Sequence, residues 1–213
     1  MVNHPPNHRA RILEAAARVY GEHGFRGATT RRIATAAGVN EVTLFRLFGS
    51  KNALIDEAVR CHAANGERPS ALPDRPGVPE TELTSWALTV LQHLTRNATM
   101  IRKCMGEMEE RPEMVPNACA GPTIATESLY SYVQKLRRAG QVTADGELRA
   151  AVSMLIGALF AEGMSRDMMP QNYPASIEKS ATMYVRLFLR AIGFQPATPK
   201  RAIRKKPRIR VAA

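Results

Sequence analysis

The fold is decided by residues 29–51, TTRRIATAAGVNEVTLFRLFGSK, which predict two short helices joined by a tight turn. Thr29 is a good cap for the first helix, because its hydroxyl can accept a hydrogen bond from the free backbone N–H groups of the first turn. Gly38 stands where a helix commonly ends in the left-handed region. Asn40 follows two residues later and is expected to cap the second helix.

The second helix has one face for the core and one for a partner. Leu44 and Phe48 are four residues apart and are expected to be buried together. At 100° per residue, Val42, Phe45 and Arg46 point the other way. A helix-turn-helix whose second helix is offered outward is suited to entering the major groove of DNA.

The flanking sequence extends this pattern to about fifty residues. The two helices are preceded by RILEAAARVYGEHGFRGAT. The end of the second helix continues into FRLFGSKNALIDEAV. The whole of residues 9–59 resembles the N-terminal DNA-binding domain of the tetracycline-repressor (TetR) family of bacterial transcription regulators. The resemblance implies an all-α protein with an N-terminal three-helix DNA-binding domain, followed by a C-terminal helical domain for ligand binding and dimerisation.

Three positions depart from the usual family pattern. Val42 stands where the family often has glycine, and Phe45 stands where it usually has tyrosine. Leu47 replaces the histidine that usually follows. The last two changes remove polar groups that would reach DNA phosphates.

The predicted DNA contacts divide into those that position the protein and those that read bases. Val42 could meet a thymine methyl group, and Glu41 could accept a hydrogen bond from a cytosine amine. Lys51, at the start of a helix capped by Ser50, could reach a phosphate. The alternative for the arginines is a solvated helix face. The full predicted set is Thr29, Arg31, Arg32, Asn40, Glu41, Val42, Thr43, Phe45, Arg46 and Lys51.

The net charge of +11 is concentrated at the two ends of the chain. Residues 1–60 hold nine basic and five acidic side chains, residues 61–195 balance, and residues 196–213 hold seven basic side chains and no acid. Basic ends suit a polyanionic partner. For the tail alone, a purely solubilising role is equally consistent with the charge.

Composition divides the chain into four parts. Residues 1–65 form the predicted helix-turn-helix domain, and residues 66–79, rich in proline and glycine, form a linker or loop. Residues 80–195 form a helical effector-binding and dimerisation domain, and residues 196–213 a disordered basic tail.

The spacing of apolar residues predicts helices throughout the second half of the chain. The predicted helices cover Glu80–Arg96, Ala98–Glu110, Thr123–Ala139, Ala144–Arg166 and Ala175–Ile192, with a break at residues 112–122. No phosphate-binding glycine loop, metal-ligand cluster or nucleophile elbow occurs. We therefore expect neither catalysis nor a cofactor nor a metal.

Two groups of apolar residues in this half are candidates for function, and ordinary core packing is the alternative for both. Thioethers and aromatic rings suit an adaptable apolar cavity, so the predicted pocket residues are Trp86, His93, Met100, Met105, Met108 and Tyr132. The last two helices are expected to form a four-helix dimer interface, through Leu155, Leu159, Phe160, Met164, Met183, Tyr184, Leu187 and Phe188.

No secretory signal is expected, because the first residues, MVNHPPNHRARI, lack an apolar segment. The longest apolar run, Ala150–Ala161, is too short to span a bilayer. We therefore expect a cytoplasmic protein. Cys61, Cys104 and Cys119 are widely spaced and odd in number, which favours free thiols over disulfides or zinc, with a redox sensor as the minor alternative.

The sequence favours a homodimeric regulator that binds a double-stranded DNA operator and represses transcription until a small apolar effector binds. Two alternatives remain open. A non-specific architectural DNA-binding protein would account for the pI of about 10.1 and the basic tail. An enzyme built on the same helical scaffold is disfavoured, because no acid–base pair or nucleophile is evident.

Overall fold

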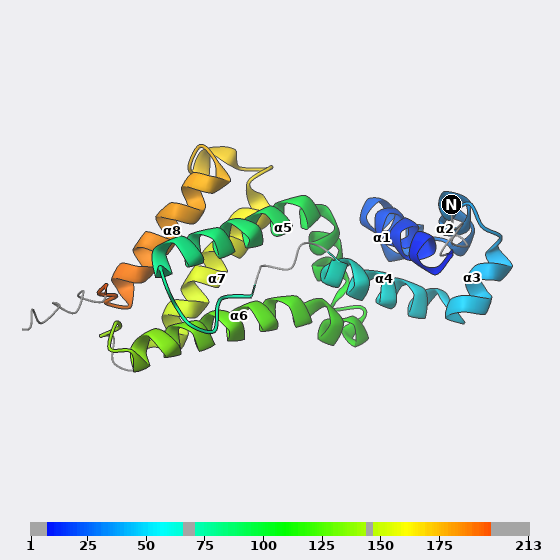
Figure 1. Ribbon diagram of the computed structural model, residues 1–213. Coiled ribbons are helices and arrows are strands. Elements are labelled where there is room, and N and C mark those ends of the chain that lie inside the picture. Colours follow the sequence, from blue (N-terminus) through cyan, green and yellow to red (C-terminus); the bar gives the residue numbers. More distant parts are fainter. Residues whose placement is uncertain (1–7, 66–70, 144–146, 197–213) are drawn as a thin grey trace, which may run out of the picture.

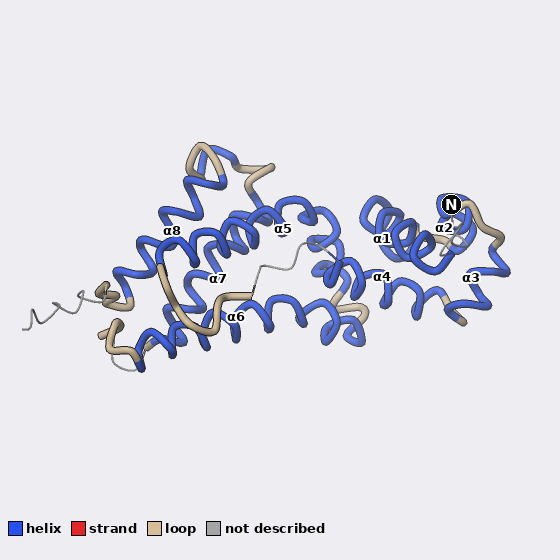
Figure 2. Tube along the Cα trace, viewed as in Figure 1, coloured by secondary structure: helices blue, strands red, loops and turns tan. Residues whose placement is uncertain are grey.

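The computed structural model describes residues 8–65, 71–143 and 147–196, and these are helical with short connections (Figures 1 and 2). No strand forms within those ranges, so the predicted all-α class is confirmed. The N-terminal helices lie at one end of the molecule, and α7 and α8 lie at the other (Figure 1). The helices are α1 (His8–Gly27), α2 (Thr30–Ala37), α3 (Glu41–Phe48), α4 (Lys51–Asn65), α5 (Pro79–Glu107), α6 (Val115–Arg138), α7 (Leu148–Ser165) and α8 (Ile177–Ala191), with two 3₁₀ turns, η1 (Pro112–Met114) and η2 (Pro170–Asn172).

Helices α1 to α4 enclose a small core of their own. Ile12 and Tyr20 of α1, Ile33 of α2 and Leu44 of α3 are completely buried in it. Helix α1 contacts both α2 and α4, and so holds the helix-turn-helix from behind. The three predicted helices and their order are thus confirmed for this end of the chain.

The regular part of α1 ends at Gly24, which has φ 66° and ψ −179°. Glycine adopts a positive φ at no steric cost, so the chain turns there before resuming a last helical turn to Gly27. Ala28 N–H donates to the Gly24 carbonyl at 2.9 Å. The turn places Phe25 at the edge of the small core.

Helix α5 is one continuous helix of 29 residues, where the sequence pattern predicted two helices separated near Arg96. That prediction was wrong, because the residues between Arg96 and Ala98 include neither proline nor glycine and nothing there breaks the hydrogen-bond ladder. At a rise of 1.5 Å per residue the helix is about 43 Å long. It therefore spans from the C-terminal bundle to the N-terminal domain.

The predicted break at residues 112–122 is also shorter than expected. The interruption covers residues 108–114, which end in η1, and α6 begins at Val115. Pro116 lies in the first turn of α6, where no intrahelical donor is needed. Pro122 stands inside the helix and does not end it.

Helices α5 to α8 enclose the larger core, around Trp86, Leu91, Tyr132 and Leu159. Helices α5 and α7 approach closely at Gly163, where an added Cβ would lie 2.4 Å from the Leu94 Cβ. A glycine is therefore required at this crossing.

The two cores meet along α5. Cys104 of α5 and Met114 of η1 are buried in the core of the N-terminal domain, although both follow the proposed linker in sequence. Helix α4 in turn contacts α6. The N-terminal domain is thus packed against the C-terminal half by side chains that belong to the latter.

Helix α7 is predominantly apolar, with a mean hydropathy of 1.3. By length and composition alone it could cross a membrane, but a core helix of a soluble protein passes the same test. It packs against α5, α6 and α8, yet only 39% of its residues are buried within the protomer. A large part of its apolar surface therefore has no cover within the described residues.

The predicted basic tail lies almost wholly outside the described residues, which end at residue 196.

Candidate nucleic-acid interface

The turn between α2 and α3 has the predicted capping chemistry. The Thr29 hydroxyl accepts from Arg32 N–H at 3.2 Å, and Asn40 Oδ1 accepts from Val42 N–H at 2.9 Å. Gly38 adopts φ 63° and ψ 42°, and Val39 N–H donates back to the Ala34 carbonyl at 3.0 Å. These bonds fix α3 relative to α2 within a few residues.

The two faces of α3 separate as the spacing predicts. Leu44 is completely buried and Phe48 is nearly so. Val42 is 71% exposed, Phe45 is 46% exposed, and Arg46 is exposed with no hydrogen-bond partner among the described residues. Thr43 is half-buried beside them. Helix α3 therefore presents an apolar and cationic surface that the protein itself does not use.

The predicted phosphate contacts on α2 differ in how far they are already engaged. Arg32 donates to the Gly27 carbonyl at 2.7 Å, so it is held against the end of α1. Arg31 is exposed and has no described partner. It lines a shallow cavity with Arg18 of α1, a basic residue outside the set predicted from the sequence. Nothing in the sequence signals Arg18, because its place beside α2 depends on how α1 and α2 pack.

Glu41 does not point freely toward the groove. Its carboxylate accepts a hydrogen bond from the hydroxyl of Thr30, the first residue of α2. Glu41 is half-buried and ties the N-terminus of α3 to that of α2. This position favours a role in orienting α3 over the predicted contact with cytosine.

Lys51 begins α4 as predicted, and the Ser50 hydroxyl caps that helix by accepting from Ala53 N–H at 3.1 Å. The Lys51 ammonium, however, lies 4.2 Å from the centroid of the Phe25 ring. Burial lowers the pKa of Lys51, and the nearby guanidinium of Arg111 lowers it further. A phosphate contact would require this side chain to leave the ring.

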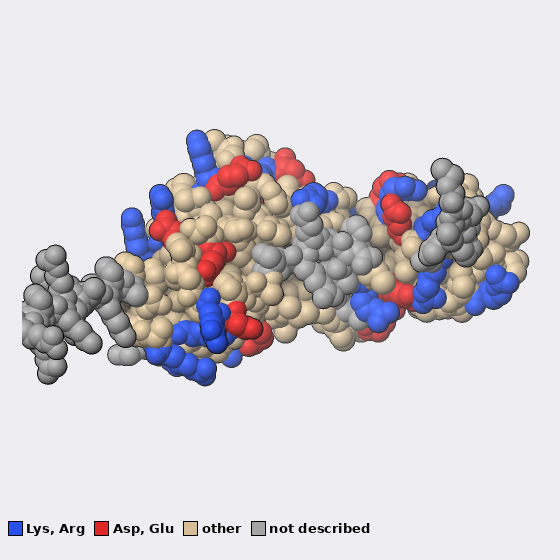
Figure 3. All heavy atoms as spheres, in the orientation of Figure 1, with Lys and Arg blue, Asp and Glu red and all other residues tan. Residues whose placement is uncertain are grey.

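Basic side chains are spread over the end of the molecule that carries α2 and α3 (Figure 3). A second basic group lies at the end of α6, where Lys135 is paired with Asp74 and Arg137 donates to Gln134. Arg138 of that group is exposed with no partner among the described residues, as are Arg31 and Arg46 beside α3. The group beside α3 differs in flanking a helix whose outer face is exposed and unengaged. An outward helix flanked by free cations is what DNA recognition requires.

The family model "Bacterial regulatory proteins, tetR family" matches residues 12–58, which run from the second turn of α1 to the middle of α4. The chain belongs to the TetR family. Like its curated relatives, it is a helix-turn-helix transcription regulator.

Individual relatives agree with this assignment to different extents. The TetR-family chain is 26% identical over 141 residues to an uncharacterized HTH-type transcriptional regulator, YvkB, of Bacillus subtilis, covering 66% of this chain and 74% of that one. It is 43% identical over 60 residues to the HTH-type transcriptional repressor AcnR of Corynebacterium efficiens, but this covers only 28% of this chain and 32% of AcnR. The fold matches that of the flavonoid-responsive regulator FrrA with a TM-score of 0.69 at 20% identity, covering 91% of this chain and 100% of that one.

The structure does not bring the predicted pocket residues of this TetR-family protein together. Trp86 and Tyr132 lie in the larger core, whereas Met100 and Met108 pack against the core of the N-terminal domain. Met105 is 47% exposed and His93 is half-buried between the two groups. Because α5 is continuous, Trp86 and Met108 are about 33 Å apart along it. One cavity cannot hold all six residues.

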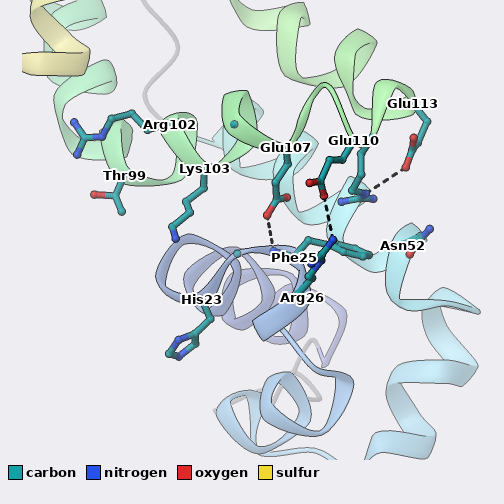
Figure 4. A pocket seen from close by; sticks show the side chains of 13 residues that line it. His23, Phe25, Arg26, Asn52, Thr99, Arg102, Lys103, Glu107, Glu110 and Glu113 are labelled. Atoms are coloured by element: carbon teal, nitrogen blue, oxygen red, sulfur yellow. Dashed lines mark hydrogen bonds and ion pairs between the residues drawn. The ribbon is translucent and has the colours of Figure 1, made fainter.

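A cleft of about 870 Å³ lies instead at the junction between the two halves (Figure 4). Charged residues dominate its lining, and none of the six predicted pocket residues lines it. The cleft is formed by the end of α1, the start of α4, the end of α5 and the segment up to Glu113.

The predicted dimer residues divide into buried and exposed sets. Leu155, Leu159, Met164 and Phe188 lie inside the protomer, each less than a tenth exposed, so they cannot form the surface of an interface. This part of the prediction was wrong. Helix α7 is so largely apolar that its sequence does not reveal which side faces its own core. On α8, Phe188 lies on the buried side with Val185 and Leu189. Phe160 and Tyr184 are half-buried, and Met183 and Leu187 are more than half exposed.

Within the described ranges, no group of three His, Cys, Asp or Glu side chains gathers where a metal ion could be held. The three cysteines are free thiols, with Cys104 buried, Cys61 half-buried and Cys119 exposed. Burial raises the pKa of the Cys104 thiol, which disfavours the reactive thiolate.

Proposed function

We propose that this chain is a homodimeric repressor that binds a palindromic DNA operator through α3 and is released from it by a small molecule. The observation that carries the proposal is the outer face of α3, where Val42, Phe45 and Arg46 are exposed and unengaged. Thr43 lies at the side of the same face. Residues 1–65 would form the DNA-binding domain, residues 66–79 the linker and residues 80–195 the effector and dimerisation domain.

The uncovered surfaces of α7 and α8 support the dimer. Met154 of α7 is 73% exposed, and an added Cβ at Gly157 would meet no other atom. Met183 and Leu187 of α8 are four residues apart and share one exposed face. Uncovered apolar surface of this kind marks a protein interface. Two copies joined by a two-fold axis would present two α3 helices to the two halves of a palindrome.

Similarity to two known proteins supports the proposal that the chain represses transcription and is released from its operator by a small molecule. The curated relative AcnR is named a repressor, and the fold neighbour FrrA is described as flavonoid-responsive. In this chain the effector would enter the α5–α8 bundle near Trp86 and Tyr132, which share the larger core. Effector binding would favour an arrangement of the two DNA-binding domains that no longer fits the operator. The protein would act in the cytoplasm, where DNA is accessible.

The recognition helix can be tested with an operator obtained by selecting random duplexes with the full-length protein. Arg46→Ala or Thr43→Ala is expected to weaken operator binding by about 1–3 kcal/mol, because each removes a contact to a base edge. Excess random duplex should not displace the wild-type protein, since a specific regulator prefers its operator by about 10³-fold or more.

Arg190→Ala is the matched control, because Arg190 is exposed at the end of α8, far from α3 (Figure 1). It removes the same charge and should leave the preference intact. If random duplex competes as well as operator, the protein is the non-specific architectural type. If the Arg46/Thr43 double variant binds like the wild type, α3 does not read the bases.

The basic tail should add affinity without specificity. Deleting residues 196–213 removes seven cationic side chains. We expect operator and random duplex to be weakened by a similar factor. The slope of log K against log salt should become less steep by about 0.9 for each phosphate that the tail neutralises in the full-length protein. Titrations of both duplexes at several salt concentrations measure this, and superimposable slopes would mean that the tail does not touch DNA.

A further inference from the structure

The end of α5 is joined to the end of α1 by polar contacts across the cleft (Figure 4). Glu107 of α5 accepts from the Tyr20 hydroxyl at 2.7 Å and from Phe25 N–H, also at 2.7 Å. Tyr20 is completely buried. The last turn of α5 therefore fixes the position of Phe25, whose ring faces the cleft.

Arg111, the residue directly before η1, reaches across this junction into the DNA-binding domain. Its guanidinium lies 3.7 Å from the centroid of the Phe25 ring and donates to Asp56 of α4 at 3.2 Å. A third contact, to Glu113 at 3.2 Å, comes from its own segment. Arg111 is only 8% exposed, and its Nη1 is buried without a partner.

Lys51 is the second cation on the same ring, with its ammonium 4.2 Å from the centroid. Each cation is attracted by the ring, but the two repel each other, and Lys51 is partly withdrawn from water. The negative charge of Glu107 partly offsets this repulsion. Of the two, Arg111 is held by Asp56 and Glu113, whereas Lys51 has no carboxylate within ion-pair distance among the described residues. Lys51 is therefore the cation that can leave.

We propose that Arg111 is a positioning residue for the DNA contact of Lys51. This inference rests on the proposed DNA-binding function. By occupying the Phe25 ring, Arg111 makes the ring a poor resting place for the Lys51 ammonium and so favours its transfer to a DNA phosphate. Arg111 belongs to the segment after α5. A shift of that segment therefore changes how strongly the Lys51 ammonium prefers a DNA phosphate over the Phe25 ring. The C-terminal half thereby acts on one DNA contact through a single side chain.

A double-mutant cycle on operator binding tests the proposal. Lys51→Met is expected to weaken binding about five- to tenfold and to reduce the salt slope by about 0.9, the effect of one phosphate contact. Arg111→Met should weaken binding about threefold or more when Lys51 is present. In the Lys51→Met background the same change should have only the small effect of removing a distant charge.

Arg26→Met measures that distant-charge effect. Arg26 lines the same cleft, but its side chain is 91% exposed and only loosely paired with Glu110, at 3.5 Å. A second readout needs no DNA. In labelled protein, the pKa of Lys51 followed by NMR should rise in Arg111→Met and stay unchanged in Arg26→Met, because only Arg111 shares the ring.

The outcomes separate this inference from the proposed function. An equal reduction in affinity from Arg111→Met in both backgrounds means that Arg111 only holds the two halves together, and the inference is then wrong while DNA binding stands. If Lys51→Met changes neither affinity nor salt slope, the phosphate contact itself is wrong. Should Arg111→Met not fold, Arg111→Gln keeps a planar polar group against Phe25 and removes only the charge, and the same cycle applies.

Discussion

A Met183→Glu/Leu187→Glu variant is expected to be a folded monomer that no longer holds its operator. Both side chains are more than half exposed in the protomer, so replacing them should change the free energy of unfolding of the protomer itself very little. In a two-fold dimer each substitution appears twice, which brings four carboxylates into one apolar interface. Unpaired charges buried in this way strongly oppose association.

Light scattering should report a mass of twice 23.4 kDa for the wild type and a single 23.4 kDa for the variant. Operator affinity should fall about 10²–10⁴-fold, because a monomer loses the second half-site and the effective concentration that the dimer supplies. Ile124→Glu is the control, since Ile124 is 68% exposed on α6 and lies outside the proposed interface. A variant that remains dimeric would place the interface on another surface.

The contrast with Leu159→Glu and Phe188→Glu shows why the structure is needed for this prediction. Both residues are candidates for disrupting a dimer when only the sequence is considered. Leu159 is completely buried and Phe188 is 5% exposed, so a carboxylate at either position should unfold the protomer. Leu159 lies on α7, where apolar residues are so numerous that the few polar ones do not mark the side that faces solvent.

The helix-turn-helix, by comparison, could be predicted in detail. Thr29, Asn40 and Ser50 cap their helices as expected, and Gly38 adopts the left-handed conformation. These features depend on chemistry within three or four residues, which a single sequence displays directly. The burial of Leu44 with Phe48 follows from spacing alone, so the outward face of α3 was equally predictable.

The junction between the two halves could not be predicted. Phe25 lies at the edge of the small core, yet its ring contacts Lys51 and Arg111. Arg111 is 60 residues after Lys51, and they meet only because α5 continues unbroken past Arg96 to the N-terminal domain. Local patterns carry no information on such contacts, because they depend on which helices pack together.

Glu162 is the carboxylate for which we expect the largest change in stability. It is completely buried in α7, where Oε1 accepts from Arg166 Nη2 at 2.6 Å and from Arg166 Nε at 2.9 Å. Its Oε2 accepts from the Tyr184 hydroxyl of α8 at 2.7 Å. Burial raises the pKa of Tyr184, and its bond to the Glu162 carboxylate raises it further, so the phenol remains a donor at neutral pH.

Glu162→Leu should therefore destabilise the protein by about 3–5 kcal/mol, because it leaves the Arg166 guanidinium with no carboxylate in a largely buried site. Ser180 and the Pro174 carbonyl would still bind that guanidinium, but neither carries a negative charge. Glu127→Leu is the matched control. It breaks the Glu127–Arg149 pair, whose two side chains are more than half exposed, and should change stability by less than about 1 kcal/mol.

The double variant Glu162→Leu/Arg166→Met distinguishes a charge effect from a packing effect. It removes both charges, so most of the stability should return if the unpaired guanidinium causes the destabilisation. Urea unfolding at pH 7 and a fixed protein concentration measures the stability of all four proteins, since dimerisation contributes to the apparent stability.

The Tyr184 hydroxyl stays unpaired in the double variant, so α7 and α8 lose the polar bond between them even where stability recovers. Dimer affinity should then remain below the wild-type value, because these two helices carry the proposed interface. Full recovery of both stability and dimer affinity would mean that the bond from Tyr184 to Glu162 does not contribute to the interface. No recovery of stability would mean that the site depends on the volume of these side chains and not on their charge.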